Sequence, residues 1–260
     1  MRRNRNNHKV NKVGKIHLPI KTLAAIIALV ILALYSFGSF QRLKNSDFFK
    51  IKEVLFRGNP GVDLSFLKGE NLLSLDLDRE SAYILGRSSG IKSVRLVRIL
   101  PDRVLVDFIK RVPAAIVKLY RSFCVDSEGV LFDCSKDEQN AGLVEILGLD
   151  RKIFGPKPGK AYNNIKELSL ALEVIKEIKG KLPQEGFQIT LVDVSSPQDA
   201  NFVLARQQDK IQVKIGRSYI RDKITILDSL IHQQKDSLGK IKYIDLRFKE
   251  PVIKFKDAKQ

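Results

Sequence analysis

Residues 91–110 read IKSVRLVRILPDRVLVDFIK, and they decide the fold of the first half of the chain. From 91 to 100 apolar residues alternate with mostly basic ones, and the same period of two returns from 103 to 110. Pro101-Asp102 between the two runs is a turn signal. A period of two places alternate side chains on opposite faces, so this stretch predicts a β-hairpin with one buried and one solvent-exposed face.

The residues before this hairpin complete a small unit. Residues 48–58 alternate loosely and run into Asn59-Pro60, which predicts a strand closed by a turn. Leucines after residue 63 and a helical period over 79–86 predict two short helices. We therefore expect a β-α-α-β-β domain over residues 48–114. Its core is expected to include Ile51, Val54, Val94, Leu96, Val104 and Val106.

Further toward the N-terminus, residues 22–40 (TLAAIIALVILALYSFGSF) carry no charge over 19 positions. As a helix this run spans roughly 28 Å, close to the thickness of a bilayer, so we predict a transmembrane helix over 22–41. A cleaved signal peptide is the alternative, although its apolar region is normally shorter, and a buried core helix is a further one. Residues 1–21 form a tail without acidic residues, which predicts a cytoplasmic N-terminus. Its cations are Arg2, Arg3, Arg5, Lys9, Lys12, Lys15 and Lys21.

This topology puts the remaining chain outside the cytoplasm, in a protein with a formal charge of +17. Export across a membrane argues against nucleic acid as the partner of that basic surface, and we expect none. Acidic cell-wall polymers, lipid head groups or an acidic protein are possible partners, and a solvated surface without a partner is the simplest interpretation. The expected location is the inner membrane, with a single pass through the bilayer.

Two cysteines, Cys124 and Cys134, lie in the exported part, where a disulfide can persist. They flank the turn signal 126–129, and a hairpin centred there places Cys124 opposite about Leu131. A bond would need a bulge or a longer loop, so the pattern argues against easy pairing and leaves the question open. The two cysteines have no histidine near them in sequence, so we expect no zinc site and no cofactor.

Residues 115–257 form the second predicted domain, of the α+β class, with an antiparallel sheet and flanking helices. A helical period covers 165–179 with Leu168, Leu172, Ile175 and Ile178 on one face, and strands over 187–194, 201–205 and 210–215 form a meander. Ser218 is expected to cap a second helix, with Ile220, Ile224, Leu227, Leu230 and Ile231 on one side. The last strands, 241–248 and 252–255, are separated by Pro251, which favours a sheet edge.

We find no catalytic set in the sequence and predict a protein that is not an enzyme and has no small-molecule substrate. The three histidines are His8, His17 and His232, and the last is expected on a helix surface. The loosely grouped carboxylates, Asp126 with Asp133 and Asp193 with Asp199, stand beside turn residues where Asp accepts backbone hydrogen bonds. Asp245 and Arg247 share one face of a strand, which favours an ion pair over a partner surface.

The order β-α-α-β-β resembles a POTRA module. Residues 101–102, followed by Lys110-Arg111-Val112-Pro113-Ala114-Ala115, are similar to the W-P-D…E-R-x-P-x-A signature of the FtsQ/DivIB cell-division family, with Leu100 and Lys110 as departures. Three later segments match the family in order: 124–132 is similar to V-D-x-x-G-x-V-F, 211–217 to L-x-L-G-R, and 243–248 to Y-V-D-L-R-Y/F.

This resemblance implies a non-catalytic scaffold of the bacterial divisome at the septum, which binds bitopic coiled-coil partners of the FtsB and FtsL type. It implies β-augmentation at the edge of the terminal sheet. The candidate partner-binding residues are Tyr243, Arg247, Phe248, Val252, Ile253, Lys254 and Phe255, and at least one of the two aromatics Tyr243 and Phe248 is expected to pack inward. A POTRA-bearing transport or envelope-assembly component and an anchored cell-wall enzyme are the alternatives.

Overall fold

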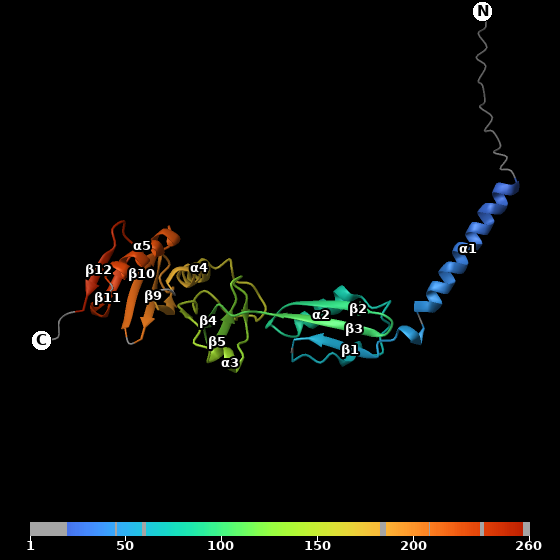
Figure 1. Cartoon of the computed structure of the whole chain (residues 1–260), viewed down its shortest axis with the longest axis horizontal. Coiled ribbons are helices and arrows are strands. Elements are labelled where there is room, and N and C mark those ends of the chain that lie inside the picture. The colour runs from blue at the N-terminus through green and yellow to red at the C-terminus, as the bar shows by residue number, and fades with distance from the viewer. Residues whose placement is uncertain are drawn as a thin grey trace, which may run out of the picture. The chain divides into compact units, whose positions relative to one another are not determined.

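The computed structural model describes residues 20–44, 46–58, 61–182, 186–207, 209–234 and 237–256, and Figure 1 labels the helices and strands. Most of the predicted basic tail, residues 1–19, lies outside them. Contacts between Cα atoms divide the chain into two compact units. The first comprises residues 1–54, 65–75 and 98–104, and the second comprises 55–64, 76–97 and 105–260. The domain bounds 48–114 and 115–257 stay a prediction.

In the first unit, helix α1 (Ile20–Lys44) covers the predicted transmembrane segment. Among the residues that the structure describes, no helix combines the length and the apolar character needed to cross a bilayer. The predicted membrane anchor is therefore not confirmed and stays a prediction. After it come the short 3₁₀ helices η1 (Asp47–Phe49) and η2 (Ser65–Leu67). The Ile51 amide donates to the Glu70 carbonyl at 2.9 Å, and the Leu72 amide donates to the Phe49 carbonyl at 2.8 Å.

The predicted hairpin is confirmed. Strands β2 (Ile91–Ile99) and β3 (Arg103–Lys110) join β1 (Glu53–Arg57) in a three-stranded sheet with the order β1-β3-β2, and the division between the two units runs through these strands. Helix α2 (Leu77–Gly86) begins where the Asp76 side chain accepts from the amides of Asp78 and Arg79. Of the expected core residues, Ile51, Leu96, Val104 and Val106 are buried, whereas Val54 and Val94 are only partly buried.

The prediction of a short helix after residue 63 is wrong, because η2 is a single 3₁₀ turn. Gly69 follows it with a positive φ of 85°, a conformation that ends a helix. The Asn71 side chain then accepts from the amides of Leu73 and Ser74, and this turn replaces helical hydrogen bonds. The Arg98 guanidinium donates to the Leu72 and Leu75 carbonyls, so the irregular segment stays hydrogen-bonded.

The second unit contains a nine-stranded sheet with the order β12-β11-β10-β9-β8-β7-β4-β5-β6. Its strands are β4 (Ala115–Lys118), β5 (Ser122–Val125), β6 (Leu131–Phe132), β7 (Glu145–Leu147), β8 (Gln188–Asp193), β9 (Asp199–Arg206), β10 (Asp209–Gly216), β11 (Ile241–Asp245) and β12 (Val252–Phe255). The meander β8-β9-β10 is confirmed. The prediction of an antiparallel sheet is wrong, because β4 pairs with β7, β7 with β8, and β10 with β11 in parallel.

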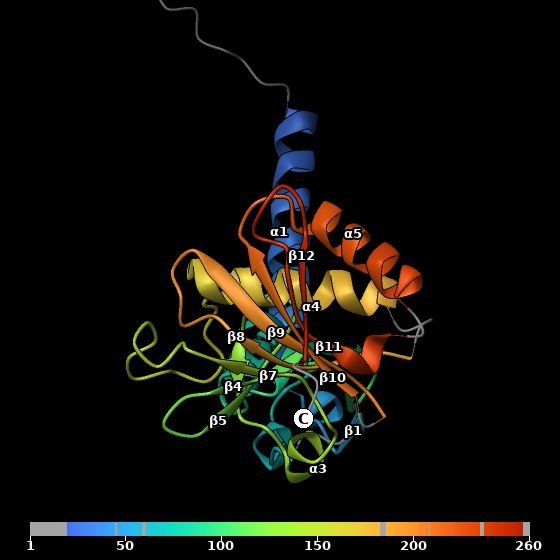
Figure 2. The ribbon, with the colours of Figure 1, turned by 90° about the vertical axis from the view of Figure 1, so that its left-hand side faces the viewer.

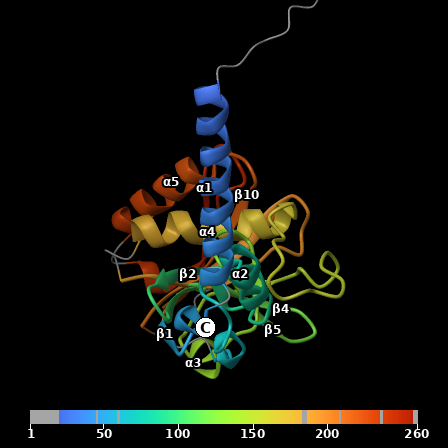
Figure 3. The ribbon, with the colours of Figure 1, turned by 90° about the vertical axis from the view of Figure 1, so that its right-hand side faces the viewer.

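In two of these three parallel pairs, β7–β8 and β10–β11, a long helix separates the two strands along the chain. Helix α4 (Lys166–Lys181) lies between β7 and β8, and α5 (Ile220–Gln233) lies between β10 and β11. When a helical crossover connects two neighbouring strands, the second strand runs parallel to the first. Figures 2 and 3 show both helices on the same side of the sheet, where their buried side chains and those of β8–β11 form the main core.

The expected faces of α4 and α5 are largely confirmed. Leu168, Ile175 and Ile178 are buried, as are Ile220, Ile224, Leu227 and Ile231, whereas Leu172 and Leu230 are partly buried and pack against the core. His232 lies exposed on α5. Ser218 does not cap α5: the N-cap is Tyr219, which has a left-handed φ of 60° and makes no capping side-chain hydrogen bond.

The expectation against easy pairing of the cysteines is wrong, because Cys124 and Cys134 form a disulfide with their Cα atoms 5.1 Å apart. In the β5–β6 pair, Cys124 lies opposite Phe132 rather than Leu131. The register therefore differs by one residue from the predicted one. Cys134 is two positions beyond Phe132, and because side chains alternate between faces, it follows Phe132 on the face that Cys124 occupies.

Candidate partner-binding edge

Strand β12 forms one edge of the nine-stranded sheet, where Pro251 led us to expect an edge. It pairs antiparallel with β11, and Ile244 lies opposite Ile253. Lys256 directly follows β12. Its backbone amide donates to the Lys240 carbonyl and its side-chain Nζ donates to the Gly239 carbonyl, each at 2.7 Å. These bonds hold the end of β12 against the 3₁₀ helix η4 (Leu238–Lys240).

The structure places the candidate residues on and beside this edge. Ile253 packs partly buried against the main core, whereas Val252, Lys254 and Phe255 are exposed. Tyr243 is partly buried, and the Lys214 Nζ lies 5.3 Å from the centre of its ring. Phe248 is 59% exposed. Of the two aromatics, one of which was expected to pack inward, Tyr243 does so in part and Phe248 does not.

Arg247 is held in a cluster of ion pairs. Its guanidinium donates to both carboxylate oxygens of Asp245, with a shortest distance of 2.7 Å, and to Asp199 Oδ2 at 2.9 Å. The predicted ion pair between Asp245 and Arg247 is therefore confirmed. Asp199 lies at the start of β9, 48 positions earlier in the chain, and nothing in the local pattern connected it to Arg247.

The cluster also ends strand β11, which was predicted to continue to residue 248. The Asp245 side chain accepts from the Arg247 backbone amide at 3.0 Å, so the chain turns out of the sheet at that point. The hydrogen bond from Arg247 holds the pKa of Asp245 below its ordinary value. The pKa of Asp199 is lowered by hydrogen bonds from the Ser196 side chain and, secondly, from Arg247. Both carboxylates are thus stabilised in their charged form.

A hollow of about 750 Å³ opens next to this cluster, between the end of β10, the start of α5 and the turn after β11. Two exposed aromatics border it: Phe248, and Tyr219, which is 77% exposed. Its other lining residues include the cations Arg217, Lys223, Arg247 and Lys249. The sequence did not connect Tyr219 with this edge, because a left-handed backbone at a tyrosine leaves no signal in the pattern.

Arg217, which lines this hollow, belongs to a second partly buried ion pair. It donates to Glu167 Oε1 on α4 at 3.1 Å. Burial acts to raise the pKa of Glu167, but its backbone amide, Arg217 and Lys152 outweigh burial and lower it. The motif residue Arg217 therefore ties the end of β10 to α4.

The carboxylates that the sequence grouped do not act as pairs. Asp126 binds Arg111 Nη1 at 2.6 Å, and Asp133 binds Arg121 Nη2 at 2.7 Å. Asp193 accepts from Ser195 in a turn, whereas Asp199 belongs to the Arg247 cluster. Over the described ranges, no three His, Cys, Asp or Glu side chains gather in a way that could hold a metal ion.

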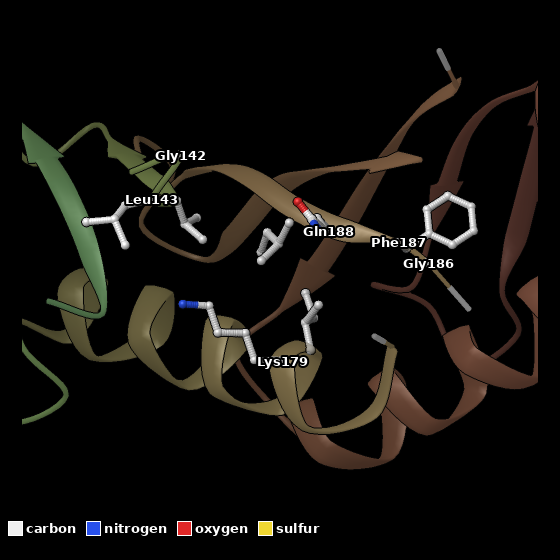
Figure 4. Close-up of a pocket in the computed structure, with 9 residues that line it drawn as sticks. Gly142, Leu143, Lys179, Gly186, Phe187 and Gln188 are labelled. Carbon is white, nitrogen blue, oxygen red and sulfur yellow. The ribbon is translucent and has the colours of Figure 1, made fainter. Parts of the chain in front are cut away.

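A smaller hollow, of about 280 Å³, lies between α4 and the start of β8. Figure 4 shows Lys179 on α4 and Gln188 on the strand at opposite sides of it. The Lys179 Nζ donates to the Ala114 carbonyl at 3.2 Å, and most of the remaining lining is apolar. None of the candidate partner-binding residues lines this hollow.

Comparison with known proteins identifies the second unit. Residues 115–247, which span the sheet from β4 to the Arg247 cluster, match the family model of the C-terminal domain of the cell division protein FtsQ/DivIB. The fold and this match define a bacterial cell-division protein. The chain belongs to the FtsQ/DivIB family.

Relatives extend this similarity over most of the chain. The cell division protein FtsQ of Syntrophotalea carbinolica is 26% identical over 226 residues, covering 84% of this chain and 78% of the relative. FtsQ of Koribacter versatilis is 22% identical over 250 residues, with 92% and 69% covered. FtsQ of Rickettsia prowazekii is 33% identical over 118 residues, with 42% and 43% covered.

Proposed function

We propose that this protein is a non-catalytic, single-pass membrane scaffold of the divisome, and that its edge strand β12 binds division partners of the FtsB and FtsL type. The observation that supports this proposal best is the position of β12 at the end of the sheet, with Val252, Lys254 and Phe255 exposed. An edge strand offers a row of backbone donors and acceptors, and an extended partner segment can pair with it.

The two edge strands of the sheet differ in how well each could pair with a partner segment. At the opposite end, β6 contains only Leu131 and Phe132, both buried, and the disulfide lies beside it. Strand β12 is longer, and two of its four side chains are large exposed hydrophobic groups, Val252 and Phe255. Apolar side chains beside an open edge supply the burial that backbone pairing alone lacks. The proposed partner segment therefore pairs with β12 rather than with β6.

The rest of the proposal concerns placement. The basic residues before α1 favour a cytoplasmic N-terminus, and α1 is proposed as the anchor that confines the protein to the inner membrane at the septum. Residues 48–114 are proposed as a POTRA-like domain and 115–257 as the partner-binding domain. The role requires no cofactor, nucleic acid or small-molecule substrate.

The test is recovery of the coiled-coil partners with the full chain after gentle solubilisation of the membrane. Deleting residues 250–256 removes β12, and we expect the apparent affinity to fall by about tenfold or more. Tyr120→Ala is the matched control, because Tyr120 is an exposed aromatic in the turn after β4. It should leave recovery unchanged.

Circular dichroism of each variant separates loss of binding from loss of fold. A folded deletion variant that binds the partners with unchanged affinity would overturn the edge-strand mechanism. Equal losses in the deletion variant and in Tyr120→Ala would also overturn it, because the edge would then have no special role.

A further inference from the structure

Strands β4, β5 and β6 have two different faces. One face contributes Ala115, Val117, Phe123, Val125 and Leu131 to the main core under α4. The other face carries a separate, much smaller cluster of Ile116, Cys124 and Phe132, against which Cys134 and Leu143 pack. These three buried side chains need a cover, and the cover is the segment 133–143, which contains the short helix α3 (Lys136–Gln139).

This covering segment has little to hold it in place apart from the disulfide. Within 133–143, only Cys134 and Leu143 pack on the small cluster, and most of the other side chains are exposed. The hydrogen bonds of α3 are local: Ser135 and Glu138 form a reciprocal capping box. Asp133 is tied to Arg121 and Ser89 at one end, and the Ile116 amide donates to the Val144 carbonyl at the other.

We propose that Cys124 and Cys134 form an oxidation site for a thiol–disulfide oxidant, and that their bond is the clamp that keeps the segment 133–143 on the small cluster. Reduction would leave a cover with two partly buried apolar contacts over an apolar face. Such a cover opens locally, while the main core on the opposite face of the strands stays closed. A disulfide of this kind persists in an oxidising compartment, which agrees with the proposed location outside the cytoplasm.

The chemistry requires an oxidant that carries a disulfide of its own. The thiolate of one cysteine attacks the oxidant's disulfide, forms a mixed disulfide and releases one oxidant thiolate. The thiolate of the second cysteine then attacks the protein sulfur of that mixed disulfide and releases the other oxidant thiolate. Two cysteine thiols lose two electrons and two protons, and the oxidant disulfide gains them as two thiols.

The structure also assigns an order to the two sulfurs. Cys124 is fully buried in β5, whereas Cys134 is partly exposed at the edge of the cover. An external thiol or disulfide therefore reaches Cys134 first. Cys134 forms the mixed disulfide with the oxidant, and Cys124 resolves it.

The test uses the full chain, reduced with a phosphine and reoxidised with oxidised glutathione as the probe. A lysine-specific protease reports the state of the cover at Lys136, which is exposed within it. We expect reduction to raise the rate of cleavage after Lys136 by about tenfold or more, and reoxidation to reverse this. Lys249, an exposed lysine in the turn between β11 and β12 and outside the cover, is the internal control and should be cleaved at an unchanged rate. Lys136→Gln should abolish the cleavage that reduction induces.

Alkylation of the reduced, folded chain tests the order of the sulfurs, and Cys134 should react faster than Cys124. Equal cleavage at Lys136 with and without the bond would overturn the clamp. Parallel acceleration at Lys136 and Lys249 would do so too, because it would indicate general unfolding. Equal alkylation of the two cysteines would overturn the assigned order. None of these readouts depends on a division partner, so the clamp and the edge-strand proposal can fail separately.

Discussion

Arg247→Ala is expected to destabilise the sheet domain itself. The guanidinium makes four hydrogen bonds, three to Asp245 and one to Asp199, between 2.7 and 3.2 Å. The Asp245 side chain is only 7% exposed, the Asp199 side chain 17% and Arg247 37%. Removing Arg247 leaves one buried and one half-buried carboxylate without their shared cation.

The size of the expected loss in folding stability follows from this intermediate burial. Breaking a fully buried pair costs about 3–5 kcal/mol, whereas an exposed pair contributes about 0–1 kcal/mol. Because one partner is buried and the other is more than a third exposed, we expect about 2 kcal/mol. For a domain of this size, that loss lowers Tm by about 4–8 °C. Thermal unfolding followed by circular dichroism on the full chain in detergent measures it.

A double-mutant cycle identifies the cause. Asp245→Asn retains the oxygen that accepts from the Arg247 backbone amide but removes the charge. In the Arg247→Ala background it should restore about half of the lost stability, about 1 kcal/mol, whereas in the wild-type background it should not stabilise the domain. Arg151→Ala, at an exposed arginine in a turn, is the matched control and should change Tm by less than about 2 °C.

Two results would refute this reasoning: an Arg247→Ala variant as stable as the Arg151→Ala control, or strictly additive effects in the cycle. The outcome matters for function as well. If Arg247 stabilises the turn before β12, then charge reversal at Arg247 cannot by itself report a contact with a partner. The partner-binding test must then rest on β12 and Phe248.

Four further predictions concern pH, packing, a glycine and topology. The folded-state pKa values of Asp199 and Asp245 lie below their unfolded values, so their contribution to folding stability is complete above about pH 4 and is lost as pH falls further. Asp245→Asn should therefore make Tm depend less on pH below about pH 4. Val106→Ala, at a fully buried side chain, should cost about 1–3 kcal/mol in thermal unfolding, whereas Val94→Ala, at a partly buried one, should cost less; equal costs would contradict the burial pattern. Gly148→Ala should lower Tm by several degrees, because Gly148 has a φ of 87° and an added Cβ would lie 2.4 Å from the Ser195 amide nitrogen. Gly142 has a similar φ of 65° but open space around it, so Gly142→Ala is the control and should lower Tm less. A reporter fused after Gln260 should be active only outside the cytoplasm, and recovery of a mature chain that begins near Ser39 would remove the anchor.

Local periodicity in the sequence was sufficient to predict individual helices and strands and which of their faces are buried. The alternation over 91–110 predicted β2 and β3, because a strand with one buried face must repeat every second residue. The helical period predicted α4 and α5 and most of their buried faces for the same reason. Pro251 indicated that β12 lies at an edge, since a proline cannot donate to a ladder. The position of the candidate edge was therefore readable from the sequence.

Only the tertiary structure decided which distant segments meet. The parallel pairs β7–β8 and β10–β11 arise from the crossovers through α4 and α5, and periodicity contains no information on strand direction. A register shift of one residue brought Cys124 and Cys134 together, although a pattern of period two locates a strand without choosing its partner residues. Asp199 reaches Arg247 because β9 and β11 both lie beside β10, a proximity that no local signal encodes. Residue spacing along the chain reports burial, whereas pairing and charge partners depend on contacts between segments that are far apart in sequence.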